Sequence, residues 1–194
     1  MSLRQPLSIV TVFWCWLIPV GLAWTVGGSS SSTSLQRDES VGDHPVVASL
    51  ISEHTSIQPG GSTRVGVYFE LKEGWHIYAK DPGDAGLPTK VTWNGPFGVS
   101  FGTLYWPKSR QFLDPGNIKT FGYTGSVLLS SNLTYHTWRD VYSEIPVHAS
   151  VEWLACKDIC VPGTAQLDLK LPITSTPPIL SSHAQLFKES HLSP

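Results

Sequence analysis

The chain of 194 residues has the length of one domain, and it can bury a hydrophobic core without the help of a cross-link. Its net charge of -2, from 13 basic and 15 acidic residues, excludes a basic field for nucleic acid and a polybasic patch for anionic lipid. With 17 Gly, 15 Pro and only 14% charged residues, the composition favours many short strands over long charged helices. We therefore expect an all-β protein.

The first residues predict an export signal. Arg4 is followed by an apolar run over residues 9–24, which is shorter than the ~20 residues of a membrane-spanning helix and is interrupted by Pro19. Small residues come next, which favours a cleaved signal peptide over residues 1–27, and an uncleaved N-terminal anchor is the alternative. The polar, serine-rich stretch over residues 28–45 is typical of a flexible linker.

Alternation of apolar and polar residues predicts a domain of short strands over residues 46–174. The turn signals between the strands favour an antiparallel β-sandwich of immunoglobulin-like type. Strands are expected at residues 46–52, 63–72, 75–80, 89–93, 99–106, 125–133, 147–156 and 164–171.

Two segments fall outside this pattern of short strands. The segment over residues 107–125 is too long and irregular for a simple connection, so we interpret it as a functional or mobile loop. The tail over residues 175–194 begins rich in proline and ends with a possible short helix at residues 184–190.

Cleavage of the signal removes Cys15 and leaves Cys156 and Cys160 in an oxidising compartment, where a neighbouring pair is usually joined. These cysteines lie where the last two predicted strands turn. In each strand the apolar residues point one way, so both cysteines fall on the polar side, where we expect a partner's thiolate to reach them. The pair therefore occupies the solvent side of a predicted hairpin.

The spacing of the cysteines leaves three interpretations open. A bond that closes so small a ring stabilises a fold by only about 2 kcal/mol, against ~3 kcal/mol for a loop of about 15 residues. This weakness favours a redox couple over a structural disulfide, although both remain possible from spacing alone. A metal site would need two more ligands, for which His76 and His148 are the plausible residues.

Four stretches, in order, resemble a known family: "GWHIYAKDPGDAGLPTKVTW", "YWP", "FGYTGSVLL" and "VEWLACKDICVPGTAQLDL". Over residues 46–172 the chain is similar to the N-terminal periplasmic domain of the DsbD protein-disulfide reductases, especially the branch that includes the copper-sensitivity suppressor ScsB. The resemblance implies an immunoglobulin-like sandwich that takes electrons from a thioredoxin-like donor, itself recharged through a membrane domain. It also implies that the acceptors are periplasmic disulfide isomerases or cytochrome c maturation factors.

The resemblance assigns roles to individual residues. Cys160 matches the cysteine that forms mixed disulfides with partners, and Cys156 matches the resolving cysteine of the Cys156–Cys160 bond. Phe121 is the best match to a phenylalanine on a cap loop that shields the bond, with an ordinary core residue as the alternative. Tyr78 and His76 match two aromatic residues that line the site. The three-residue spacing of this chain is shorter than in the best-known members.

The leading hypothesis is therefore a periplasmic thiol–disulfide exchange module that needs no cofactor and no metal. If the domain stands alone, its donor and a membrane electron transporter are separate proteins. Two alternatives remain. One is a module that binds copper through the reduced cysteines with His76, and the other is a purely structural interaction domain held by the disulfide.

Overall fold

The computed structural model describes residues 44–114, 116–136 and 142–192, so the predicted signal peptide and most of the predicted linker lie outside the described residues. The elements are β1 Val46–Ser52, β2 Ser62–Leu71, β3 His76–Gly83, β4 Lys90–Asn94, β5 Val99–Phe101, β6 Arg110–Asp114, β7 Ile118–Thr124, β8 Ser126–Tyr135, β9 Glu144–Cys156, β10 Cys160–Pro172 and α1 Ala184–Leu192.

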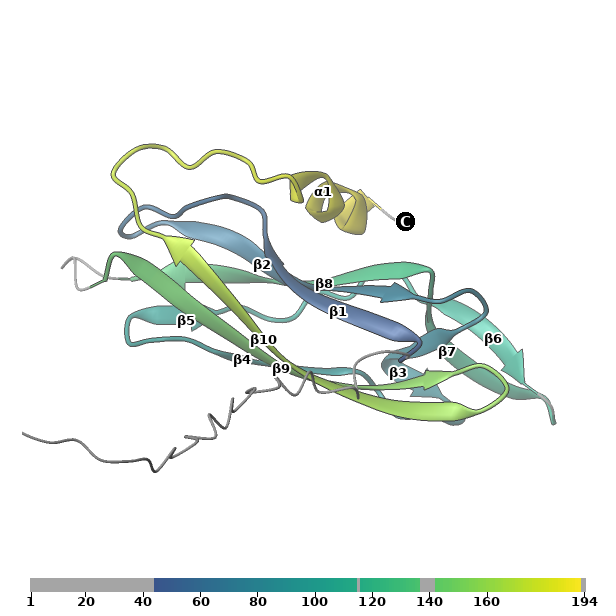
Figure 1. Ribbon diagram of the computed structural model, residues 1–194. Coiled ribbons are helices and arrows are strands. Elements are labelled where there is room, and N and C mark those ends of the chain that lie inside the picture. Colours follow the sequence, from purple (N-terminus) through teal and green to yellow (C-terminus); the bar gives the residue numbers. More distant parts are fainter. Residues whose placement is uncertain (1–43, 115, 137–141, 193–194) are drawn as a thin grey trace, which may run out of the picture. The chain divides into compact units, whose positions relative to one another are not determined.

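The strands form two sheets of an antiparallel, immunoglobulin-like sandwich, as the sequence predicts (Figure 1). One sheet has the order β1-β2-β8-β5, and the other has the order β10-β9-β3-β7-β6 with β4 paired to β9. Val67 and Phe69 of β2 meet Val151 and Trp153 of β9 in the core, because in each strand every second side chain is apolar and points inward.

The segment over residues 107–125 is not the irregular loop that the sequence suggests. It contains β6 and β7, which pair as a hairpin from Arg110 opposite Gly122 to Asp114 opposite Ile118. Gly116 and Asn117 turn the chain with positive φ angles of 87° and 62°, a conformation that glycine and asparagine tolerate best. The sequence did not predict this hairpin, because its side chains do not alternate cleanly between apolar and polar.

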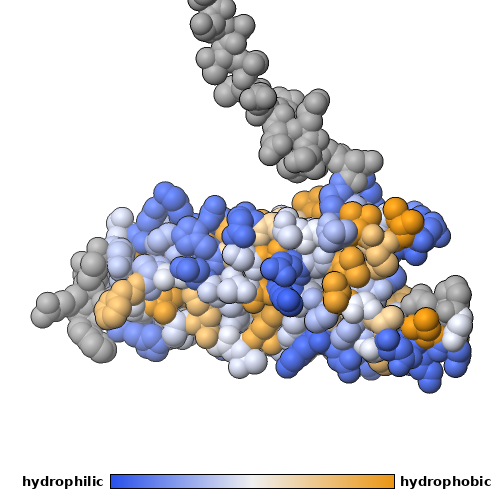
Figure 2. All heavy atoms as spheres, turned by 90° about the horizontal axis from the view of Figure 1, so that it is seen from below, coloured by the Kyte–Doolittle hydropathy of each residue, from blue (hydrophilic) through white to orange (hydrophobic). Residues whose placement is uncertain are grey.

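The β6–β7 and β9–β10 hairpins end at the same end of the sandwich (Figure 1). The outer face of the six-stranded sheet, seen from below in Figure 2, mixes hydrophilic and hydrophobic side chains. On this face Lys90 of β4 pairs with Glu152 of β9, and Ser150 donates a hydrogen bond to Gln166 of β10. The sheet therefore faces solvent along most of its outer side.

The tail crosses the outer face of the four-stranded sheet, where α1 covers β2 and β8 (Figure 1). Phe187 is fully buried there against Ile51 and Leu128. Arg64 binds the Glu53 carboxylate, donates a hydrogen bond of 3.0 Å to the Phe187 carbonyl, and places its guanidinium 5.3 Å from the centre of the Phe187 ring. Within the described residues, no helix is long and apolar enough to cross a membrane.

Candidate functional site

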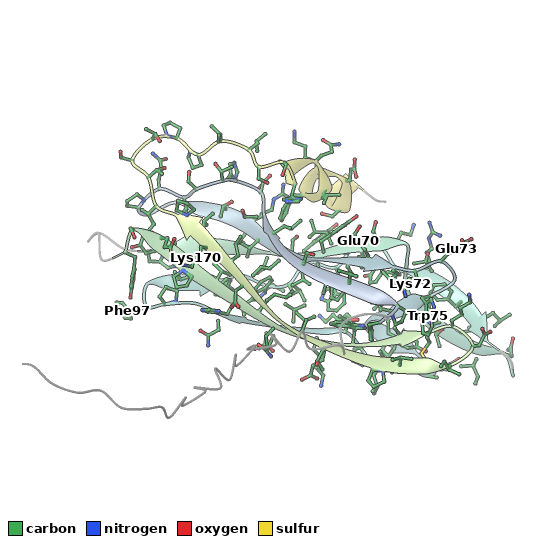
Figure 3. All side chains as sticks on the ribbon, viewed as in Figure 1. Glu70, Lys72, Glu73, Trp75, Phe97 and Lys170 are labelled. Carbon is green, nitrogen blue, oxygen red and sulfur yellow. A yellow bond between two sulfur atoms is a disulfide. The ribbon has the colours of Figure 1, made fainter. Side chains whose placement is uncertain are left out.

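The two strands of the last hairpin place the cysteines directly opposite each other. Cys156 ends β9, Cys160 begins β10, and the two residues are cross-strand partners with their Cα atoms 4.1 Å apart. Their sulfur atoms form a disulfide. The connecting turn of three residues is closed by a hydrogen bond of 3.0 Å from the Lys157 N–H to the Ile159 carbonyl. Figure 3 shows the disulfide at the same end of the sandwich as Glu73 and Trp75, and Phe97 at the opposite end.

The two sulfurs differ in access to solvent, which corrects one expectation from the sequence. Cys160 is exposed as expected, but only 3% of Cys156 is exposed, so a partner cannot approach it directly. Alternation puts Cys156 on the outer side of the sheet, yet it does not determine whether other elements cover that side. Here Tyr78 of β3 does so, and its buried hydroxyl donates a hydrogen bond of 3.4 Å to the Cys156 sulfur.

His76, Tyr78 and Phe112 form an aromatic cover beside the disulfide. His76 is the cross-strand partner of Cys156 in the β3–β9 pairing. Its ring stacks on Phe112 of β6, with centroids 4.7 Å apart and planes at 23°, and it meets the Tyr78 ring edge-on at 5.2 Å. The structure therefore brings together Cys156, Cys160, Tyr78 and His76, the residues for which the resemblance suggests roles at the site.

Gly86 allows the loop after β3 to rest on this cover. A Cβ atom at Gly86 would lie only 2.4 Å from the Tyr78 ring, and the residue has a φ angle of +97°. Both the contact and the backbone conformation require glycine. The sequence gives a signal for this residue, because Gly86 lies in the turn-rich stretch "DPGDAGLP" next to the predicted aromatic strand.

Phe121 does not lie beside the disulfide. In β7, Gly122 is opposite Tyr78 and faces the outer side with it, whereas Phe121 packs against the core with Tyr123. Phe121 also lines a hollow of about 280 Å³ together with Trp106. Phe112 instead shares the outer side with His76, so Phe112 is the phenylalanine that this hairpin places next to the site. A sequence prediction that included the β6–β7 register would have placed Phe112 beside His76.

The remaining polar groups do not assemble a metal site among the described residues, where no cluster of three or more His, Cys, Asp or Glu side chains is close enough to hold an ion. His148 contacts Asp168 across the β9–β10 pairing. It lies eight residues along β9 from Cys156, which is about 26 Å in a strand, so it is not near the cysteines. The copper-binding alternative remains a prediction.

Tyr123 lines the same hollow as Phe121, and its pKa departs from the ordinary value. Burial, with a smaller contribution from Tyr105, raises the pKa of Tyr123 to about 12. The Tyr123 hydroxyl donates a hydrogen bond of 2.7 Å to the Pro107 carbonyl. This tyrosine fixes the segment before β6 and thereby supports the hairpin that carries Phe112.

The fold and the site together define a β-sandwich domain with an asymmetric disulfide at a hairpin end, one sulfur exposed and the other held under aromatic side chains. Comparison with known proteins gives the family: a model described as "Thiol:disulfide interchange protein DsbD, N-terminal" matches residues 48–172. The chain belongs to this family and is a thiol–disulfide interchange domain with a cysteine pair. A search of curated protein sequences gave no match.

One solved structure supports this fold, and a second match is weaker. The N-terminal periplasmic domain of ScsB from Proteus mirabilis superposes with a TM-score of 0.56 and 18% identity, over 78% of this chain and 56% of that chain. The N-terminal domain of DsbD from Neisseria meningitidis, in the reduced form, matches at a TM-score of 0.27 and 13% identity, over 69% of this chain and 91% of that chain. This chain therefore spans little more than half of the ScsB chain that it matches.

Proposed function

We propose that this domain carries electrons in the periplasm through the Cys156–Cys160 couple, with Cys160 as the residue that meets partners. The observation that carries the proposal is the difference in access: Cys160 is exposed, whereas Cys156 is 3% exposed and accepts a hydrogen bond from Tyr78. A disulfide exchanges by in-line attack of a thiolate on one sulfur, so the exposed sulfur is the one attacked.

Electron uptake follows from this arrangement. A thiolate of a thioredoxin-like donor attacks the Cys160 sulfur, the bond to Cys156 breaks, and the electron pair leaves with Cys156 as a thiolate. The Tyr78 hydroxyl donates to that sulfur and stabilises the charge. The donor's second thiolate then attacks its own sulfur in the mixed disulfide and releases Cys160. The donor is oxidised by two electrons, and the domain gains both electrons and, from solvent, two protons.

Delivery reverses these roles. The Cys160 thiolate attacks the disulfide of an acceptor, and one acceptor sulfur leaves as a thiolate. Cys156 then attacks the Cys160 sulfur, which re-forms the intramolecular bond and releases the reduced acceptor. Cys156 needs no access to the partner in either direction, because it reacts only with the neighbouring Cys160.

Phe112 is proposed to act as the shield of the couple in place of Phe121. It reaches the aromatic cover from β6, an edge strand of the sheet, and stacks on His76. Because an edge strand is held on one side only, β6 and Phe112 can move aside when a partner docks without breaking the sandwich. The Phe112 ring would then limit reduction of the bond by small thiols while it allows exchange with a docked protein.

The location and the partners rest on the family and on the sequence. Periplasmic export is supported by the predicted signal peptide over residues 1–27 and by the match to a periplasmic domain. We infer a thioredoxin-like donor, supplied by a membrane electron transporter. The inferred acceptors are thioredoxin-fold proteins such as a disulfide isomerase or a cytochrome c maturation factor.

Trapping of mixed disulfides tests the proposal. Cys156→Ser leaves Cys160 free to attack and removes the resolving thiol, so we expect it to accumulate a covalent adduct with a periplasmic thioredoxin-fold protein. Cys160→Ser is the matched control, since its only thiol is buried, and it should trap none. Equal trapping by both variants, or no adduct with any such protein, would refute the assignment. Adducts are read by non-reducing electrophoresis and mass spectrometry.

A further inference from the structure

We propose that His76 is the proton acceptor of Cys156, and that it forms an imidazolium–thiolate pair with this cysteine when the disulfide is reduced. This inference rests on the proposed exchange function and adds a residue to it. An aromatic ring at this position needs only to pack, whereas a histidine can also take up and release a proton near neutral pH.

The first argument is proximity within the sheet. His76 of β3 and Cys156 of β9 are direct cross-strand partners. The side chains of such partners point to the same face, with Cβ atoms about 5 Å apart. Tyr78, two residues further along β3, already contacts the Cys156 sulfur from that face. His76 therefore lies in the adjacent strand, on the same face of the sheet as the sulfur that becomes a thiolate.

The second argument is the way in which the ring is held. Phe112 stacks on one face of the imidazole at 4.7 Å, and Tyr78 meets it at nearly a right angle. The Nε2 atom is buried. A ring clamped in this way loses little freedom on forming an ion pair, and in a site sheltered from water the attraction between imidazolium and thiolate is stronger than in solvent.

The third argument is that the resolving step needs a base that takes the proton of Cys156. Cys156 is buried, and a thiol removed from water holds its proton more tightly and makes a weaker nucleophile. The resolving step requires its thiolate. The Tyr78 hydroxyl stabilises that charge but cannot accept the proton near neutral pH, because it already carries one. A neutral imidazole accepts it, as in other Cys–His pairs.

The proton and the electrons then balance in both directions. During uptake, Cys156 leaves the disulfide as a thiolate, and His76 takes a proton from solvent and pairs with it as an imidazolium. During delivery the Cys156 thiolate of this pair attacks the Cys160 sulfur, and the imidazolium then returns its proton to solvent. His76 is neither consumed nor oxidised in either direction.

Other charged side chains lie on the elements around His76. Besides Tyr78 and Cys156, these elements carry Lys80 on β3, Lys157 and Asp158 in the cysteine turn, Arg110 on β6 and Glu73 in the turn before β3, while β7 places Thr124 opposite His76. Histidine is the side chain whose ordinary pKa lies between pH 5 and 8. A rate change near neutral pH that is lost when only His76 is replaced is therefore assigned to the histidine.

The decisive experiment follows the resolving step directly, with dithiobis(nitrobenzoate) as the probe. The reduced domain releases one nitrothiobenzoate when Cys160 attacks the reagent. It releases a second when Cys156 attacks the Cys160 mixed disulfide. We expect His76→Phe, which preserves the aromatic stack, to slow the second release by about 10-fold at about pH 6.5, with an effect that becomes smaller as the pH rises, because a growing share of Cys156 then loses its proton without a base.

Two measurements keep the test independent of folding and of partners. His148→Phe removes a histidine elsewhere on β9 and should leave the second release unchanged. In the unmodified domain, the NMR titration midpoint of His76 should be higher in the reduced form than in the disulfide form, since only the reduced form provides a thiolate. Equal midpoints in the two forms, or equal second-release rates for His76→Phe and the unmodified domain, would overturn the assignment.

Neither measurement uses a protein partner, so the result is separate from the test of the exchange function. A domain that traps no thioredoxin-fold protein could still give the predicted histidine titration, and the proposed function alone would then fail. A domain that traps partners but has identical midpoints would retain the exchange function and lose the role of His76.

Discussion

Both sheets of the sandwich have part of their outer face covered, and the two covers are attached in different ways. Over the four-stranded sheet, α1 buries Phe187 completely and is fixed by Arg64, which contacts both Glu53 and the helix backbone. Over the cysteine end of the other sheet, the cover consists of aromatic rings on β3 and on the edge strand β6, and Cys160 stays exposed beside it.

The helix cover contributes to the stability of the fold, whereas the aromatic cover limits access to the disulfide. Removing α1 from its sheet would expose a buried aromatic side chain and leave the Glu53–Arg64 pair open to solvent, so this cover belongs to the folded core. Lifting Phe112 away from His76 breaks one ring contact and the β6–β7 pairing, which lies at the margin of the sheet. The hairpin end also carries exposed apolar side chains, Leu113 and Ile118, that are suited to contact with a partner.

The largest effect is expected at the helix cover. Phe187→Ala should lower the free energy of unfolding by about 3–5 kcal/mol, because it empties a fully buried site. Urea denaturation measures this loss. The rate at which dithiothreitol reduces the disulfide in the folded variant should not change. Leu180→Ala, at an exposed position of the same tail, is the control. A loss of stability below about 1 kcal/mol for Phe187→Ala would contradict the conclusion that α1 belongs to the folded core.

Tyr78→Phe should show the opposite pattern at the cysteine end. Loss of the hydroxyl that donates to Cys156 removes about 1 kcal/mol of stabilisation from the leaving thiolate, which slows reduction by dithiothreitol about 5-fold. Tyr105→Phe is matched to it, because Tyr105 donates to the Ser190 carbonyl on α1 and lies under the other cover. If both substitutions slow reduction equally, the effect does not come from the hydrogen bond to Cys156, and the distinction between the two covers is wrong.

Phe112→Ala sharpens the distinction between shield and core. We expect faster reduction by small thiols, by several-fold, with little change in stability, because only part of this ring is buried. Phe121→Ala is the control: its ring packs against the core on the other side of the sheet, so it should affect stability rather than the reduction rate. Stopped-flow reduction and urea denaturation of the two variants separate these outcomes.

The last prediction concerns stability at alkaline pH. The pKa of Tyr123 is raised to about 12, from an ordinary value of 10.0, so its neutral form is favoured in the folded state. The resulting stability is complete below about pH 10 and falls as pH rises from 10 toward 12, by at most ~1.4 kcal/mol per pH unit. Urea denaturation at a series of alkaline pH values should show a shallower loss for Tyr123→Phe. If stability falls equally steeply with pH in Tyr123→Phe and in the unmodified domain, ionisation of Tyr123 is not the cause of the loss.

The sequence was most informative where side chains alternate over long strands. Val147 to Trp153 and Val65 to Leu71 gave the strands, their inner faces and the position of the last hairpin. Alternation along a strand could not predict the burial of Cys156, because this burial depends on Tyr78, which lies 78 residues earlier in the chain. The inward orientation of Phe121 could not be predicted for a similar reason. Which side a ring faces depends on the β6–β7 register, and turn residues within an irregular segment do not specify it alone.

The central claim is that the Cys156–Cys160 bond works by exchange and does not serve as a staple. The reduction potential of the domain, measured by equilibration with a thiol couple of known potential, tests this claim most directly. An exchange couple should have a potential near the thioredoxin value of about −270 mV or above. A value below about −300 mV, as is typical of structural disulfides, would contradict the account.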